Sequence, residues 1–221
     1  MTGTPGNSPT STALFRIRPR TEADLDACVR VLATVHEQNG YPVNWPTDPA
    51  SWLTPRSLLA VWVAEGEGEG GQGIVGHIAL SRSEEGDAAA ALWNRGPTAV
   101  VNRLYVDPAA RGRGVGAALM ERAVAEANSR ALHPVLEVAS TDTAAAALYE
   151  RLGWKLLAAE VEQEWGPGQR VKVRCYAAPG RTGSARSPVS AGSPGSPPRS
   201  AGSPGSASRQ TPGNSLTDSA R

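Results

Sequence analysis

The chain has 221 residues and a formal net charge of +1, with 22 Lys and Arg against 21 Asp and Glu. No apolar run approaches the roughly 20 residues that a membrane-spanning helix needs, and the polar N-terminus lacks the apolar core of a signal peptide. We therefore expect a cytoplasmic protein that does not act at a membrane.

Both ends of the chain are poor in large apolar side chains. Residues 1–13 contain none after Met1, and residues 179–221 hold eleven Ser, seven Pro and seven Gly, partly as a ten-residue repeat. Such segments cannot bury enough apolar surface to offset the entropy lost on ordering. We expect two disordered tails around one domain of residues 14–178. Five Arg and one Asp lie in the C-terminal tail, so the domain is mildly acidic and has no general footprint for nucleic acid.

Strand-like and helix-like patterns alternate along this domain. Apolar residues at every second position indicate strands, and apolar residues three or four apart indicate helices. In chain order we expect a strand at 14–18, a helix from about 21 to 37, a loop with one helical turn at 39–57, strands at 58–64 and 74–80 joined by a glycine-rich connection at 66–73, an alanine-rich segment at 88–94 that is either a short helix or a loop, a strand at 99–106, a helix at 115–130, a strand at 134–139, a helix at 141–152, and a hairpin of 154–165 and 170–177. This order predicts an α/β fold with a mixed central sheet and helices on both faces.

The two cysteines, Cys28 and Cys175, lie far apart and in no CxxC spacing. Neither a disulfide framework nor a zinc site is expected from them. They also lie outside the motifs described next, so no cysteine is a candidate acyl carrier.

The most informative segment is 104–117, LYVDPAARGRGVGA, in which a strand ends at Val106 and alternate glycines from Gly112 to Gly116 lead into a helix. Backbone N–H groups at a helix start have no intrahelical partner, and the helix dipole favours an anion there. Glycines let the backbone approach a ligand closely. With Arg111 and Arg113 beside them, these residues predict a binding site for a pyrophosphate.

Two common phosphate loops do not fit this glycine turn (residues 111–116). A Walker loop requires Gly-Lys-Ser/Thr, which is missing, and the dinucleotide pattern G-x-G-x-x-G has a different spacing and an earlier place in its domain. A turn without any ligand is the remaining alternative.

At this point the chain resembles the GNAT acyltransferase superfamily, whose members carry R/Q-x-x-G-x-G/A after the fourth strand. The same superfamily carries an Asn, a Tyr seven residues later, and a Gly-aromatic pair four and five residues after that Tyr. The matching positions are Arg111, Gly114 and Gly116 in the first motif, and Asp142, Tyr149, Gly153 and Trp154 in the second. The order of expected elements over residues 14–177 also agrees with this fold.

The resemblance implies direct transfer of an acetyl group from acetyl-CoA to an amine, without a metal. It places the pantetheine arm against the main chain of Leu104, Tyr105 and Val106, where this strand splays from the strand at 134–139. The residues implied around the pyrophosphate are Arg111, Gly112, Arg113, Gly114, Val115, Gly116 and Ala117. Asp142 and Tyr149 are the further expected cofactor contacts; Asp142 can accept a hydrogen bond but cannot donate one at neutral pH.

Two residues are candidates for proton transfer. Tyr149 could protonate the thiolate that leaves, or it could be an aromatic residue that fills the core. Glu137, in Leu136–Val138, matches the Leu-Glu-Val strand of relatives that acetylate ribosomal-protein N-termini, where this Glu is a base; the alternative is an outward strand residue in a salt bridge. His77 is either a core histidine or a group of the substrate pocket.

The acceptor is less well specified. Aromatic residues in 41–52, together with Trp93 and Asn94, either wall an acceptor pocket or cover the edge of the core. A pocket of this kind favours a small-molecule amine, and the alternatives are a protein N-terminal or lysine acetyltransferase and a non-catalytic acetyl-CoA sensor. We expect a monomer or a homodimer.

Overall fold

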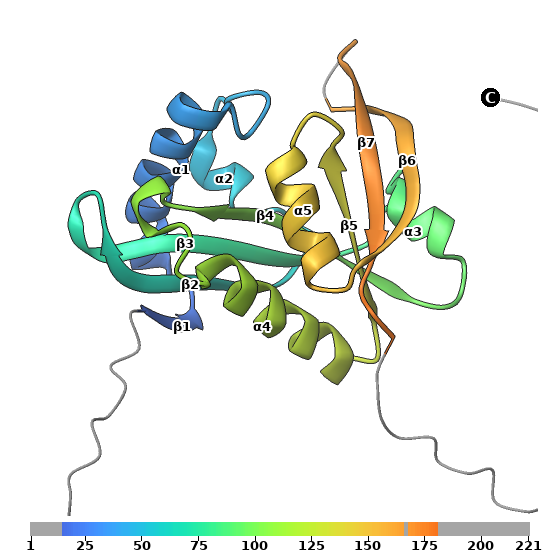
Figure 1. Ribbon diagram of the computed structural model, residues 1–221, viewed down its shortest axis with the longest axis horizontal. Coiled ribbons are helices and arrows are strands. Elements are labelled where there is room, and N and C mark those ends of the chain that lie inside the picture. Colours follow the sequence, from blue (N-terminus) through green and yellow to red (C-terminus); the bar gives the residue numbers. More distant parts are fainter. Residues whose placement is uncertain (1–14, 166–167, 181–221) are drawn as a thin grey trace, which may run out of the picture. The chain divides into compact units, whose positions relative to one another are not determined.

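The computed structural model describes residues 15–165 and 168–180 (Figure 1). The expected tail 1–13, and the expected tail 179–221 apart from its first two residues, lie outside the described residues. In chain order the elements are β1 (Phe15–Pro19), the 3-10 helix η1 (Glu22–Asp24), α1 (Leu25–Asn39), α2 (Pro49–Trp52), β2 (Leu58–Gly68), β3 (Gly71–Arg82), α3 (Ala88–Trp93), β4 (Thr98–Val106), the 3-10 helix η2 (Pro108–Ala110), α4 (Val115–Ser129), β5 (His133–Ala139), α5 (Thr143–Arg151), β6 (Lys155–Glu164) and β7 (Arg170–Ala177).

The described strands form one seven-stranded sheet in the order β1-β2-β3-β4-β5-β7-β6. The β4–β5 pair is parallel, and the other neighbouring strands are antiparallel. The predicted mixed sheet is therefore confirmed. The last strand, β7, inserts between β5 and β6, so the closing hairpin joins the sheet through its second strand.

The expected hairpin at 66–73 is present, but its strands are longer than expected. Gly66 pairs with Gly73 and Gly68 with Gly71, so β2 and β3 continue through the glycine-rich segment to a tight turn. Strand pairing uses main-chain groups, and glycine supplies these groups without a side-chain pattern that marks a strand.

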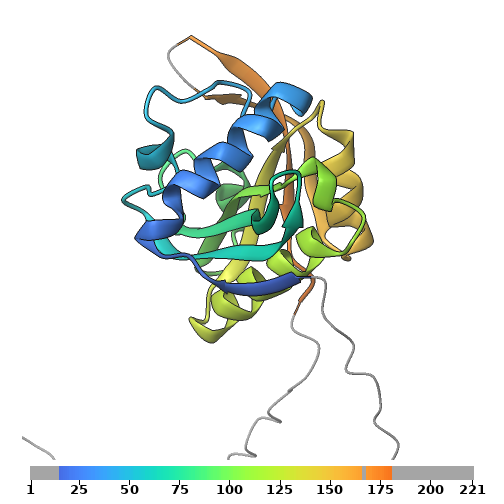
Figure 2. The same cartoon turned by 90° about the vertical axis from the view of Figure 1, so that its left-hand side faces the viewer.

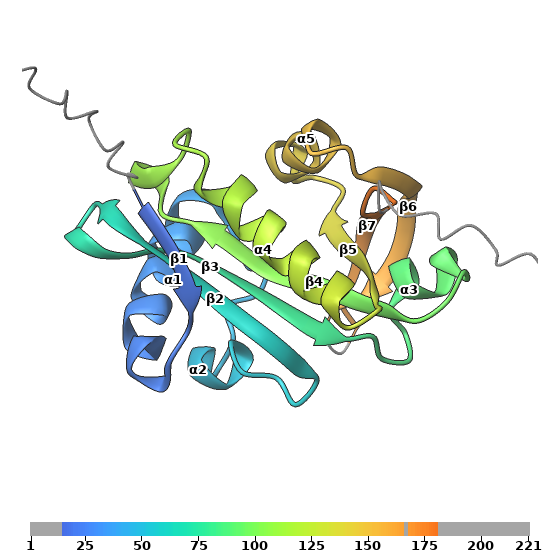
Figure 3. The ribbon, with the colours of Figure 1, turned by 90° about the horizontal axis from the view of Figure 1, so that it is seen from below.

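Helices cover both faces of the sheet (Figures 2 and 3). On one face, α4 and α5 bury the largest apolar cluster, which includes Leu119, Met120 and Leu136. On the other face, α1 packs over Val63 and Tyr105, and α3 packs over a separate cluster. Because successive strand residues point to opposite faces, neighbouring residues of β4 and β5 fall into different clusters.

The parallel strands β4 and β5 stay together for a short distance only. Their register pairs are Thr98 with His133, Ala99 with Pro134, and Val100 with Val135. Beyond these pairs the strands diverge (Figure 1), so within the described structure the edge of β4 over residues 101–106 has no strand partner on the side of β5. The splaying that the family resemblance implied is present.

A bulge in β4 lies within this diverging part. Arg103 has φ 51°, a left-handed conformation that is uncommon for a non-glycine residue. The register with β3 shifts at the same place, between His77 and Ala79. An extra residue in one strand redirects the side chains next to it, and here it turns Arg103 toward the face that carries α1 and α2.

Candidate active site

The glycine turn brings a row of free main-chain donors to the start of α4. Gly112 and Gly114 have φ values of 75° and 84°, and a Cβ at either position would meet no atom within 4 Å. The first hydrogen bond of α4 runs from Ala118 N to Gly114 O at 3.1 Å, and the N–H groups of 112–117 have no partner in the described part of the chain. The space above the turn is open, and the donors that face it fit a pyrophosphate.

Two arginines flank the turn. Arg111 Nε donates to Val106 O at 3.3 Å, and Arg113 Nη1 donates to Glu67 O at 3.1 Å. Both side chains are exposed, and neither forms an ion pair with a carboxylate of residues 15–165 or 168–180. Their positive charge therefore adds to that of the helix terminus.

The three residues at the end of β4 point their side chains to different faces. The Tyr105 hydroxyl donates to Cys28 O at 3.0 Å under α1, whereas Leu104 and Val106 pack against the cluster under α4 and α5. Their main chain lies on the diverging edge that β5 leaves free. The family resemblance assigned the pantetheine arm to this main-chain edge.

Tyr149 lies on α5 and is 7% exposed. Its ring centre lies 6.1 Å from that of Trp154 and 5.8 Å from that of Tyr176. Its hydroxyl has no hydrogen-bond partner among the described residues, and it does not count among their buried unpaired polar atoms. Burial raises the pKa of Tyr149, so the phenol stays protonated and keeps a proton to donate.

Glu137 lies on β5, and its carboxylate faces α3. Its Oε1 accepts a hydrogen bond from Ala89 N at 3.0 Å, in the first turn of that helix. Burial raises the pKa of Glu137, with the Asp87 charge adding to the effect. Tyr149 belongs to the cluster on the opposite face. The two predicted proton-transfer residues thus flank β5 from two faces of the sheet and are not in contact.

Asp142 caps α5. Its Oδ1 accepts a hydrogen bond from Ala145 N at 2.9 Å, which satisfies one of the free donors of that helix start. The carboxylate therefore has a local structural role in addition to any contact with a ligand.

A network of polar side chains on the face of α1 and α2 was not found in the sequence. Arg20 Nη1 lies 3.1 Å from His77 Nε2, and His77 Nδ1 lies 2.9 Å from Arg103 O. Arg103 in turn donates from Nε to Trp52 O at 2.5 Å. These residues come from four distant segments, so no local motif marks them. His77 is fully buried and serves as a structural link between the two arginines.

The aromatic residues of 41–52 divide between this network and the surface. Tyr41 meets Trp52 edge to face, with ring centres 6.3 Å apart, and joins the cluster under α1. Trp45 tilts against His36 at 5.2 Å and is 41% exposed. Tyr41 and Trp52 thus border the Arg103 region, as an acceptor wall would require.

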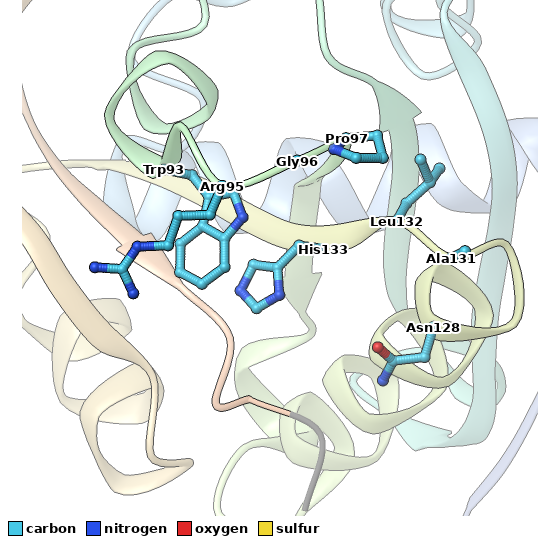
Figure 4. A pocket seen from close by; sticks show the side chains of 8 residues that line it. All are labelled: Trp93, Arg95, Gly96, Pro97, Asn128, Ala131, Leu132 and His133. Carbon is cyan, nitrogen blue, oxygen red and sulfur yellow. The ribbon is translucent and has the colours of Figure 1, made fainter. Parts of the chain in front are cut away.

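Trp93 lies elsewhere. Its ring stacks on His133 at 3.6 Å, and both line a cavity of about 220 Å³ with Arg95 and Pro97 (Figure 4). This cavity lies where β4 and β5 begin, at the opposite end of the strands from the glycine turn. The expectation that Trp93 and Asn94 wall the acceptor side together with 41–52 is therefore not met.

Both cysteines are buried free thiols. Burial raises the pKa of Cys28 to about 11 and that of Cys175 to about 12, so both stay protonated. Within residues 15–165 and 168–180, no cluster of three or more His, Cys, Asp or Glu could hold a metal ion. The helices of these residues are too short or too polar to cross a membrane.

Comparison with known proteins identifies the family. A model of the acetyltransferase (GNAT) family matches residues 28–154, more than half of the chain and a range that includes both motifs. Over 85 residues the chain is 36% identical to the mycothiol acetyltransferase of Beutenbergia cavernae, an alignment that covers 36% of this chain and only 29% of that protein.

Solved structures show the same fold. Arabidopsis thaliana NAA60 in complex with acetyl-CoA has a TM-score of 0.56 at 16% identity, over 74% of this chain and 98% of that one. The Escherichia coli ribosomal-protein-S18-alanine N-acetyltransferase has a TM-score of 0.53 at 19% identity, over 78% and 97% of the two chains.

Proposed function

Because the chain belongs to the acetyltransferase (GNAT) family, we propose that it is an acetyl-CoA-dependent N-acetyltransferase that transfers the acetyl group directly to the amine of a small molecule. The observation that carries this proposal is the open glycine turn, whose free N–H groups adjoin the diverging edge of β4. We further propose that residues 14–178 are sufficient for the activity.

In this proposal the donor lies along β4. The N–H groups of 112–117, with Arg111 and Arg113, hold the pyrophosphate. The main chain of Leu104–Val106 pairs with the pantetheine amides, in place of the strand pairing that β5 does not provide. The thioester then lies between the diverging strands, within reach of α5.

Tyr149 is the proposed acid. When the amine lone pair attacks the thioester carbonyl, an N–C bond forms, the C–S bond breaks, and the sulfur leaves as a thiolate. A protonated phenol beside the sulfur can supply the proton, and burial holds Tyr149 in that form. The new amide nitrogen releases its extra proton as the product forms, and this proton, carried by solvent, restores the phenol.

Glu137 is the proposed base. An ammonium group has no lone pair, so the acceptor must lose a proton before it attacks. The Glu137 carboxylate lies on the face of the sheet that carries α3, and Tyr149 lies on the other face. The raised pKa of Glu137 makes its carboxylate a stronger base than an exposed carboxylate. Transfer is direct because the buried thiols of Cys28 and Cys175 stay protonated and are not available as acyl carriers.

Calorimetric titration with acetyl-CoA, followed by a thiol-release assay over a panel of small amines and peptides, tests the proposal. We expect binding in the micromolar range and turnover with at least one small amine. Failure to bind acetyl-CoA would overturn the proposal. Turnover with peptides alone would overturn its small-molecule part, and binding without any thiol release would indicate a sensor.

A further inference from the structure

The side chain of Arg103 is held rigidly, although no acid among residues 15–165 and 168–180 pairs with it. Its Nε donates to Trp52 O at 2.5 Å, its Nη1 donates to Asn102 Oδ1 at 3.0 Å, and its guanidinium lies 4.7 Å from the centre of the Trp52 ring. Stacking and two hydrogen bonds together leave this group little rotational freedom.

One edge of the same guanidinium remains free. Arg103 Nη2 has no hydrogen-bond partner within the described residues, and it is not among their fully buried unpaired atoms. The ion pairs of the described chain involve other basic residues: Arg16, Arg18, Arg122, Arg130, Arg170 and Lys172. Burial lowers the pKa of Arg103, and the nearby Arg20 charge adds to this effect, as expected for a partly desolvated cation.

A buried histidine fixes the main chain of Arg103. A guanidinium can only donate, so His77 Nε2 accepts from Arg20 at 3.1 Å, and His77 Nδ1 must carry the proton that it donates to Arg103 O at 2.9 Å. The His77 ring also stacks on Tyr105 at 5.1 Å. These contacts hold the β4 bulge in its left-handed conformation, a conformation that is unfavourable for arginine by itself.

The position of Arg103 joins this group to the active site. It directly precedes the proposed pantetheine-binding residues Leu104–Val106, on the part of β4 that diverges from β5. Its side chain faces α2, under the loop that contributes Tyr41 and Trp52. A charge at this place lies on the proposed acceptor side of β4, whereas the glycine turn follows the end of the same strand.

We propose that Arg103 binds a carboxylate of the acceptor, so that the substrates are small amines that also carry a carboxylate, as amino acids do. The Nη2 protons and the Nη1 proton that Asn102 does not accept can engage both oxygens of a carboxylate, an arrangement that is stronger and more directional than a single contact. This inference rests on the proposed function, because it names the acceptor class of the same site.

The test compares product-like ligands that carry a carboxylate with matched ligands in which an amide replaces it. In the presence of CoA, N-acetyl amino acids and the corresponding N-acetyl amino acid amides are titrated into the full-length protein, and their affinities are measured by ligand-observed NMR. We expect at least one N-acetyl amino acid to bind roughly 10- to 100-fold more tightly than its amide, as hydrogen bonds to a charged group suggest. Equal affinities, or no binding of any N-acetyl amino acid, would overturn the inference.

Arg103→Gln and Arg122→Gln form a matched pair. Arg122 also lies 4.7 Å from a tryptophan ring, that of Trp62, but it already pairs with Glu126 on α4. The preference for the carboxylate should disappear in R103Q and persist in R122Q. If R103Q keeps the preference while its circular dichroism matches that of the wild type, Arg103 is only a structural residue. Arg103→Lys should keep only a small part of the carboxylate preference, because a lysine ammonium cannot donate two parallel hydrogen bonds to a carboxylate as a guanidinium can.

A parallel titration of each variant with acetyl-CoA separates this inference from the proposed function. Unchanged acetyl-CoA binding with no carboxylate preference would contradict the acceptor class alone. Carboxylate binding without any acetyl-CoA binding would contradict the proposed function instead.

Discussion

The two halves of the proposed site differ in what they are made of. The donor half, residues 104–106 and 111–117, presents mainly main-chain N–H groups and an unpaired strand edge. The acceptor half, formed by Arg20, Trp52, His77 and Arg103, presents side chains held by one another. In this proposal the main-chain donors bind a pyrophosphate that is the same for every acceptor, whereas a side-chain network can vary with the acceptor.

This difference separates the effects expected of substitutions. Changes in the donor half alter acetyl-CoA affinity for every acceptor. Changes in the acceptor half alter which acceptor is used, or they lower the stability of the hydrogen-bonded side chains that form this half. The affinity for acetyl-CoA stays constant in both cases.

Tyr149→Phe removes the proposed acid and keeps the ring. We expect kcat to fall by roughly 100-fold, as for loss of a general acid, while the Kd for acetyl-CoA stays within a factor of two. Steady-state thiol release and calorimetry measure the two quantities. Tyr176→Phe is the control, because that phenol belongs to the same cluster but bonds to Glu150; an equal fall in both variants would show a packing effect.

Glu137→Gln removes the proposed base and keeps an acceptor for Ala89 N. We expect kcat/KM to fall by about 50-fold, as for loss of a general base. A base acts only when deprotonated, so wild-type kcat/KM should decline with falling pH at a pKa above the usual carboxylate value, and this limb should be missing from the variant. Glu162→Gln, an exposed residue of β6, should keep the wild-type profile; a limb that persists in E137Q would exclude Glu137 as the base.

His77→Asn tests whether the buried His77 ring stabilises the acceptor half, with the free energy of unfolding as the measured quantity. Burial lowers the pKa of His77 to about 3, below the value of about 6.5 in an unfolded chain. The stability contributed by the neutral ring is therefore complete above pH 6.5 and is lost progressively as the pH falls toward 3. Between pH 6.5 and 4.5 the wild type should lose ~2–3 kcal/mol more unfolding free energy than the variant.

Urea denaturation at a series of pH values measures this difference. Parallel curves for the wild type and H77N would show that His77 already titrates normally in the folded protein.

Gly114→Ala tests the donor half with one methyl group. Alanine at φ 84° is strained, and its Cβ enters the open space of the turn. We expect the Kd for acetyl-CoA to rise about tenfold, close to the net value of one hydrogen bond to a charged group. Gly86→Ala is the control, since Gly86 has φ 99° and is equally open; it should lose similar stability without losing affinity.

The local geometry of the proposed donor half could be predicted from the sequence, because it depends on glycine spacing and on where a helix begins. The expected helix at 115–130 and strand at 99–106 differ from α4 and β4 by one residue at an end. The family and the enzyme class, which rested on Arg111, Gly114, Gly116 and Tyr149, are confirmed.

The acceptor half could not be predicted in the same way. Its members are separated by 20 residues or more in the sequence, and a bulge, which leaves no mark in the hydropathy pattern, turns Arg103 toward Trp52. His77 was expected to be a core histidine or a pocket residue, and it is a buried link between two arginines. Trp93 was expected either to wall an acceptor pocket or to cover the edge of the core, and it stacks on His133 where β4 and β5 begin. Aromatic composition does not reveal which end of a strand pair a residue joins.

The most direct test of the division between the two halves is a titration of 15N-labelled protein followed by NMR. Acetyl-CoA should shift the amide signals of 112–117 and 104–106 most, and a carboxylated acceptor analogue added afterwards should shift the Arg103 Nε signal. If acetyl-CoA binds and leaves the amides of 112–117 unshifted, or shifts chiefly the residues around Trp93 and His133, the account of the donor half is contradicted.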